Sequence, residues 1–93
     1  MTIGVLEMDF LITGARSLKE KRRAIKGLKE QMRSRYNCSV AETDYMDVWQ
    51  RAHITACVVS NDSRHANQQV NEIARFAASA RNAELADYWI EML

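Results

Sequence analysis

The sequence has no proline, three glycines and only two cysteines among its 93 residues. Two cysteines are too few for a disulfide framework, and Cys38 and Cys57 form neither a CxxC pair nor a Cys/His metal cluster. No apolar run approaches the roughly 18 residues that a membrane-spanning helix needs. Low-complexity segments and internal repeats are also missing. These absences favour a single domain, residues 1–93, in a reducing cytoplasm, with no cofactor, metal or membrane partner.

Positive charge is concentrated in one stretch of the chain. Nine of the 13 lysines and arginines lie between Arg16 and Arg35, with only Glu20 and Glu30 as acids, so this stretch carries a formal charge of +7. The other 73 residues carry four basic and ten acidic groups, a formal charge of −6. The total of +1 therefore hides a strongly dipolar molecule, and a concentrated positive surface attracts polyanions.

The first part of the chain predicts a strand followed by a helix. Residues 2–12 alternate apolar and acidic side chains from Leu6 onward, which is the period of a half-buried strand. The sequence Ser17-Leu18-Lys19-Glu20 fits a capping box, and a helix should run from there to about Asn37. Plotted at about 100° per residue, the apolar arc of this helix contains Leu18, Ile25, Leu28, Met32 and Tyr36.

The rest of the chain predicts two strands, a helix and a last strand. Residues 38–44 and 51–60 should form a hairpin, residues from the capping cluster at 60–63 to about Ala80 a helix, and residues 85–93 a strand. The order β-α-β-β-α-β is the split pattern of the α+β ferredoxin-like fold, a four-stranded antiparallel sheet with two helices on one face. The expected core comprises Leu6, Met8, Phe10, Ile54, Ala56, Val58, Tyr88 and Ile90.

The hairpin register follows from where its turn is centred. A centre near Asp47 and Val48 would place Cys38 opposite Cys57, Glu42 opposite His53, and Asp44 opposite Arg51. The last two are favourable cross-strand charge pairs, and we predict this register on that ground.

Three segments resemble the YlxP-like family of small bacterial domains. They are Gly14–Arg23 (GARSLKEKRR), Ser39–Glu42 with Asp44 and Asp47–Ala52 (DVWQRA), and Val58–Asp62 (VVSND). The resemblance covers almost the whole chain in the right order. It implies a ferredoxin-like domain of unassigned function, with no established catalytic residues. Family genes often lie beside those for transcription termination, translation initiation and ribosome maturation, which suggests a role in RNA metabolism.

The basic helix is the strongest candidate site. A charged helix face is usually only solvated, but this face keeps like charges four residues apart, each pair costing about 0.2–0.5 kcal/mol. The pairs are Lys19–Arg23, Arg22–Lys26 and Lys29–Arg33. Retained repulsion indicates a polyanion, and we expect RNA or a ribosomal particle. The predicted nucleic-acid-binding residues are Arg16, Lys19, Arg22, Arg23, Lys26, Lys29 and Arg33.

The uncovered sheet face offers a different kind of surface. Its expected acids, Glu7, Asp9, Glu42, Asp87 and Glu91, would repel phosphates, and the aromatic motif of an RNA-recognition sheet is missing. Apolar side chains lie among these acids, and the economical way to cover them is a homodimer. The predicted interface residues are Val5, Val40, Val59 and Trp89. The alternative function is therefore a dimeric protein-interaction module with no nucleic-acid role.

The segment around Trp49 leaves two interpretations open. A Trp at the entrance to a strand most often covers the core. In the other interpretation Trp49 stacks on a base or a partner, with Gln50 and Arg51 hydrogen-bonding nearby.

Catalytic residues are not indicated. Asp44 and Asp47 lie in a predicted turn, where aspartate is favoured for its own backbone bonds, and His53 and His65 lack metal-ligand spacing. The sequence Gly14-Ala15-Arg16 is too sparse for the glycine-rich phosphate cradle of an acylphosphatase-like enzyme. We predict that the chain is not an enzyme.

Overall fold

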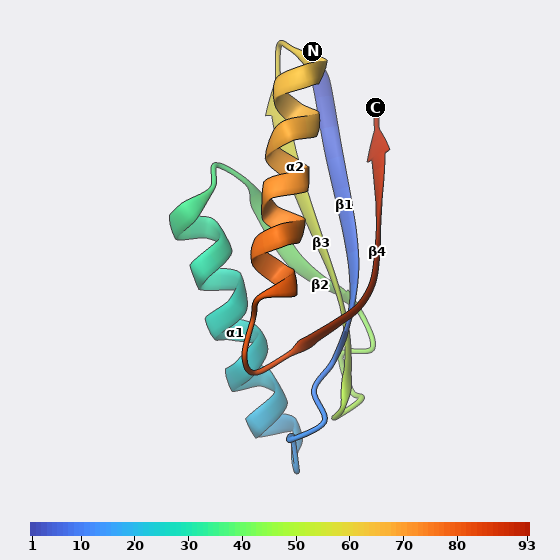
Figure 1. Cartoon of the computed structure of the whole chain (residues 1–93). Helices are drawn as coiled ribbons and strands as arrows, with labels where there is room; N and C mark the ends of the chain where they lie inside the picture. Colours follow the sequence, from blue (N-terminus) through green and yellow to red (C-terminus); the bar gives the residue numbers. More distant parts are fainter.

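The computed structural model describes all 93 residues and has the predicted element order (Figure 1). The elements are β1 (Thr2–Leu11), α1 (Leu18–Arg35), β2 (Ser39–Asp44), β3 (Arg51–Ser60), α2 (Ser63–Ala78) and β4 (Glu84–Met92). All strand pairs are antiparallel, in the order β2-β3-β1-β4, and both helices lie on one face of the sheet. The α+β ferredoxin-like prediction is confirmed.

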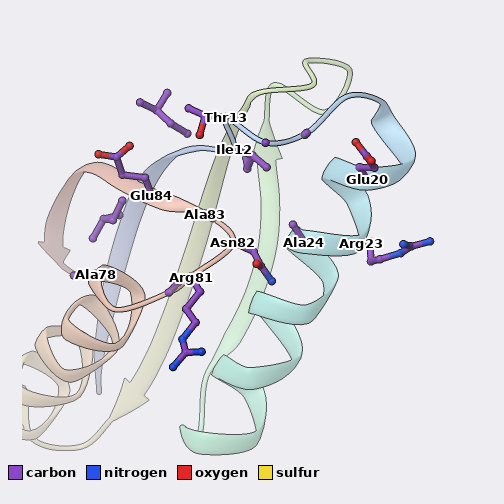
Figure 2. Close-up of a pocket in the computed structure, with 15 residues that line it drawn as sticks. Ile12, Thr13, Glu20, Arg23, Ala24, Ala78, Arg81, Asn82, Ala83 and Glu84 are labelled. Carbon is purple, nitrogen blue, oxygen red and sulfur yellow. The ribbon is translucent and has the colours of Figure 1, made fainter.

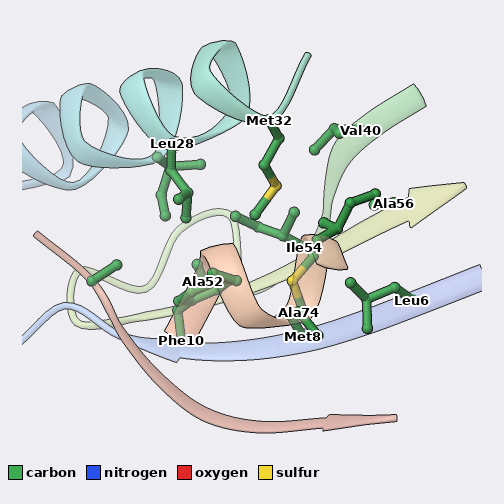
Figure 3. Close-up of a cluster of buried hydrophobic side chains, with 14 of the residues drawn as sticks. Leu6, Met8, Phe10, Leu28, Met32, Val40, Ala52, Ile54, Ala56 and Ala74 are labelled. Carbon is green, nitrogen blue, oxygen red and sulfur yellow. The ribbon is translucent and has the colours of Figure 1, made fainter. Parts of the chain in front are cut away.

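The core lies between this sheet face and the helices, where the period-2 pattern of β1 and β3 meets the apolar arcs of α1 and α2 (Figure 3). Burying one large apolar side chain contributes about 1.5–3 kcal/mol, so these layers supply most of the driving force for folding. The largest apolar side chains that are fully buried are Leu6, Met8, Phe10, Ile25, Met32, Ile54, Val70 and Ile73.

Side-chain caps fix where the helices begin. The Ser17 hydroxyl accepts a hydrogen bond from the Glu20 amide at 3.1 Å, as the capping box predicts, and the Glu20 carboxylate accepts one from the Arg16 amide. At the start of α2, Asp62 Oδ1 accepts a bond from the Arg64 amide at 2.9 Å.

The predicted hairpin register is wrong. Ser39, not Cys38, faces Cys57, and Glu42 faces Ile54; after an irregularity in the ladder Asp44 faces His53. A shift of one residue moves every side chain to the other face of the sheet. Burial of Val40, the one large apolar side chain of β2, opposite the core residue Ala56 outweighs the charge pairing from which the register was predicted.

Two residues predicted on the uncovered face therefore lie on the helix-covered face. Val40 is 5% exposed and belongs to the core, so it is not an interface residue. Glu42 points toward α1, where its carboxylate pairs with Lys21.

The predicted core is also wrong at Tyr88, which is 45% exposed, while Ile90 is only partly buried. Both lie on β4, an edge strand at the opposite side of the sheet from α1. α1 packs mainly against β2, and α2 is the helix that packs against β4, where it leaves Tyr88 nearly half exposed.

Lys21 is the least expected buried residue. Its side chain is fully buried; Nζ lies 2.7 Å from Glu42 Oε2 and also donates a hydrogen bond to the Tyr45 carbonyl. Helical spacing places Lys21 with Ile25, Leu28 and Met32 on the buried side of α1. One lysine of the basic stretch therefore faces inward and joins α1 to β2.

Replacing Lys21 by Met should destabilise the fold by about 3 kcal/mol, because it leaves the largely buried Glu42 carboxylate without its cation. The double variant Lys21→Met, Glu42→Leu should recover most of that loss, since an apolar pair of similar volume needs no compensation. Urea unfolding followed by circular dichroism measures both. The matched control Lys19→Met, on the exposed side of α1, should change stability by less than about 0.5 kcal/mol. A Lys21→Met variant as stable as the wild type would contradict this role of the ion pair.

Candidate nucleic-acid interface

Most of the predicted nucleic-acid-binding residues reach solvent. Arg16, Lys19, Arg22, Arg23, Lys26 and Arg33 are exposed and Lys29 is half-buried. We define the basic stripe as Lys19, Arg22, Lys26, Lys29 and Arg33, which share one side of α1 at helical spacing. The Arg33 guanidinium donates a hydrogen bond to the Val40 carbonyl at 2.7 Å, so this side of the helix adjoins the edge strand β2.

The positive groups of the basic stripe have no anionic partners. The ion pairs of the structure involve Lys21, Arg51 and His53, and none includes a stripe residue or Arg16. Lys21, the lysine that is paired, is the one that the core buries. The chain thus leaves the outward cations of α1 uncompensated on a surface where neighbouring positive charges repel one another.

Arg23 lies apart from the stripe and lines a groove of about 850 Å³ between α1 and the segment that follows α2 (Figure 2). The helices meet at the other end of α1, where the Tyr36 and Phe76 rings lie 6.1 Å apart. Small side chains such as Ala24 and Ala83 leave the groove open. Figure 2 shows the Arg23 and Arg81 side chains pointing in different directions, so they do not form one anion-binding cluster.

Trp49 does not cover the core. Its side chain is 51% exposed, so the first of the two interpretations made from the sequence is wrong. Its neighbour Gln50 is also exposed, and the Gln50 Nε2 donates to the Ala15 carbonyl at 3.3 Å. Arg51 lies with its guanidinium 4.1 Å from the centre of the Tyr45 ring and 3.7 Å from Asp9.

A polar network occupies the middle of the uncovered sheet face. His53 Nδ1 lies 2.8 Å from Asp9 Oδ1, and its Nε2 lies 3.2 Å from Glu7 Oε1. The second oxygen of Glu7 accepts a hydrogen bond from the Trp89 indole at 2.8 Å, and the Trp89 ring lies 5.4 Å from that of His53. The predicted hairpin register concealed this network, because it placed Glu42 beside His53, whereas the side chains beside His53 are those of Asp9 and Glu7.

The charge of His53 is set by this pair of carboxylates. Burial lowers the pKa of the imidazole, but the hydrogen bonds and charges of Asp9 and Glu7 outweigh it, so the pKa lies above the ordinary value of 6.5. The two carboxylates thus favour a positively charged His53. That positive charge partly neutralises the negative charges of Glu7 and Asp9.

The other three predicted interface residues do lie on the uncovered face. Val59 is 66% exposed and Trp89 42% exposed, while Val5 is half-buried. Around them Asp9 and Asp87 face each other across β1 and β4, so the acidic character predicted for this face is present without Glu42.

The cysteines are both free. Burial raises the pKa of the Cys38 thiol, and the charge of Arg33 only partly offsets this, so Cys38 is not an activated thiolate. None of the helices is long and apolar enough to cross a membrane. The cytoplasmic location and the absence of enzymatic activity stay predictions.

The fold and the surface together define a small ferredoxin-like domain with a basic helix. Residues 3–90 match the family described as "Protein of unknown function (DUF503)", and the chain belongs to this family. It is 31% identical over 77 residues to "Uncharacterized protein YlxP" of Bacillus subtilis (strain 168), covering 83% of this chain and 84% of that protein. The YlxP-like resemblance is thereby confirmed.

Two designed proteins are similar in structure. The de novo designed protein Foldit4 matches with a TM-score of 0.55 and 14% identity, over 100% of this chain and 97% of its own. The de novo designed protein LFR1 1, described as having a ferredoxin fold, matches with a TM-score of 0.48 and 14% identity, over 100% of this chain and 83% of its own. At such identities the likeness concerns the fold alone.

Replacing His53 by Gln should remove a pH-dependent part of the stability. Because the folded-state pKa is raised, the contribution of His53 is fully present below pH 6.5 and is lost as pH rises through the raised value. The stability difference between wild type and His53→Gln should therefore shrink from mildly acidic to alkaline pH, as measured by urea unfolding. His65→Gln, at the exposed histidine of α2, is the matched control. A difference that stays constant with pH would contradict a charged His53.

Proposed function

We propose that the chain binds structured RNA, such as that of a ribosomal particle, through the basic stripe of α1 together with Arg16. One observation carries the proposal: the outward cations of α1, exposed except for the half-buried Lys29, have no anionic partners, while the one buried cation of the helix is paired. Phosphates brought to this surface would relieve the repulsion between neighbouring stripe residues. The neighbouring genes of YlxP-like proteins, described above, support the choice of RNA among polyanions.

The size of the stripe supports contact with several phosphates. From Lys19 to Arg33 the helix rises about 1.5 Å per residue, giving a length of about 21 Å. Lysine and arginine on such a surface contact phosphates, which position a protein without reading the base sequence. We therefore propose weak binding that depends on the shape of the RNA more than on its sequence.

The uncovered sheet face is a poor alternative for RNA. RNA-recognition domains of this topology stack bases on aromatic side chains of that face. Here the Trp89 indole is engaged with Glu7, and carboxylates from β1 and β4 surround it. Negative charge at this place disfavours the approach of a phosphate backbone.

Changing both Arg22 and Lys26 to Glu should weaken binding by a similar factor for every RNA tested. Both side chains are exposed, so the fold should stay intact. If about four phosphates are engaged, log Kd against log salt for the wild type should have a slope of magnitude about 3 to 4, by the relation known for B-DNA, and the slope should fall in the variant. Fluorescence anisotropy of labelled duplex RNA measures both quantities.

The matched control is Arg64→Glu with Arg75→Glu, which reverses the same amount of charge at exposed positions of α2. This pair should change RNA affinity far less than the α1 pair. Equal losses of RNA affinity in the two double variants would mean that only the net charge of the protein matters. An α1 variant that binds RNA as tightly as the wild type would mean that the basic stripe is only a solvated surface.

A homodimer through the uncovered face is the second candidate, favoured by the 66% exposure of Val59 beside the half-buried Val5. In this case the association of the chain in a cell lysate should survive ribonuclease treatment. Val59→Lys should give a folded monomer in sedimentation, and it is a cleaner change than Trp89→Lys, which would also break the bond to Glu7. A wild-type chain that sediments as a monomer at high concentration would exclude the dimer.

A further inference from the structure

The loop between β2 and β3 exposes an unusual amount of apolar surface. Among residues 45–50, Met46 is 52% exposed, Val48 44% and Trp49 51%. None of the three belongs to the core cluster or packs against it. A six-residue turn thus carries three large apolar side chains that contribute nothing to the hydrophobic core.

The interior of the protein nevertheless holds this loop in place. The buried Lys21 ammonium donates to the Tyr45 carbonyl, which also accepts the Val48 amide at 3.0 Å. Tyr45 has a φ of 60°, a left-handed conformation that is uncommon for a bulky residue and persists only where its surroundings impose it. The Arg51 guanidinium covers the Tyr45 ring at 4.1 Å. The position of the loop backbone is therefore preorganised.

A second set of bonds places the loop beside the start of α1. The Gln50 carbonyl accepts the Ile12 amide at 2.9 Å, and Gln50 Nε2 donates to the Ala15 carbonyl at 3.3 Å. Arg16 follows Ala15 directly, and the basic stripe begins at Lys19. Trp49 and the N-terminal end of the predicted RNA surface thus lie at the same end of the molecule.

We propose that Trp49 stacks on an unpaired base next to the helical RNA held by α1. Proteins that recognise RNA often stack splayed bases on aromatic side chains, and each such stack is worth about 1–3 kcal/mol. The loop contains Asp47 and no basic residue, so a base fits it better than a phosphate. The preferred ligand is therefore a duplex with an unpaired nucleotide beside it, as in a bulge or an overhang.

RNA fits this loop better than a protein partner does. A stable protein interface buries about 800 Å² on each partner, more than three half-exposed side chains of one turn can provide. The basic stripe next to the loop adds contact area for a polyanion, and duplex RNA presents closely spaced phosphates along its whole length. The inference therefore rests on the proposed function, and it adds the class of RNA that the surface prefers.

The test compares a short blunt RNA duplex with the same duplex carrying an unpaired overhang, by fluorescence anisotropy. The wild type should bind the overhang duplex about 5- to 160-fold more tightly, the range that one stacked base provides. Trp49→Ala should abolish this preference and leave affinity for the blunt duplex unchanged. Trp49→Phe should keep much of the preference, and Met46→Ala, an aliphatic change in the same loop, should keep all of it.

The outcomes separate this inference from the proposed function. The inference is overturned if the wild type binds both RNAs equally, or if its preference for the overhang survives Trp49→Ala. In either case the double variant of Arg22 and Lys26 still tests the role of the basic stripe separately. Absence of binding to either RNA overturns both. If Trp49→Ala and Met46→Ala both abolish association with ribosomal particles and leave RNA binding unchanged, the loop binds protein and the inference is wrong.

Discussion

The buried ion pair of Lys21 and Glu42 fixes how α1 sits on the sheet. Few contacts join α1 to α2, and a groove separates them along the N-terminal part of α1. The position of α1 therefore depends on its own buried side, in which Ile25, Leu28 and Met32 provide apolar contact and Lys21 provides a buried ion pair with β2. A buried ammonium costs free energy unless it is paired and hydrogen-bonded, so this arrangement tolerates little displacement.

The same residue links the fold to both proposed binding elements. Because Lys21 faces inward, the residues one and five positions later, Arg22 and Lys26, face outward without partners. Because its ammonium also holds the Tyr45 carbonyl, the loop that carries Trp49 has a fixed position beside α1. The acidic network of Glu7, Asp9 and His53 lies on the opposite face of the sheet. The molecule thus presents opposite charges on opposite sides, which would orient it toward a polyanion.

Element order, caps and most of the core could be predicted from the sequence, because they depend on local patterns such as the alternation from Leu6 and the Ser17–Glu20 capping box. The hairpin register could not, since it depends on which face buries Val40 and on the irregularity between Glu42 and Asp44. A one-residue error there misplaced both Val40 and Glu42. Tyr88 was misplaced because a strand pattern does not tell how far the helices extend over an edge strand.

The charged residues of the candidate site could be predicted from the sequence, but the orientation of their side chains in the fold could not. Helical spacing was sufficient to find the exposed side of α1, yet Lys21 is indistinguishable by residue type from Lys19 or Lys26. Its helical spacing with Ile25, Leu28 and Met32 is the one sequence signal that could have placed Lys21 toward the core, and the predicted apolar arc did not include it. The exposure of Trp49 and the hydrogen bond from Gln50 to the Ala15 carbonyl are tertiary features that leave no local signal in the sequence.

Amide NMR of the isotopically labelled chain, titrated with duplex RNA at low salt, tests the central claim most directly. We expect shift changes that concentrate in the segment from Arg16 to Arg33 and that disappear as salt is raised. The amides of the uncovered sheet face around His53 and Trp89 should change little. Shifts centred on that face, or none along α1, would contradict it.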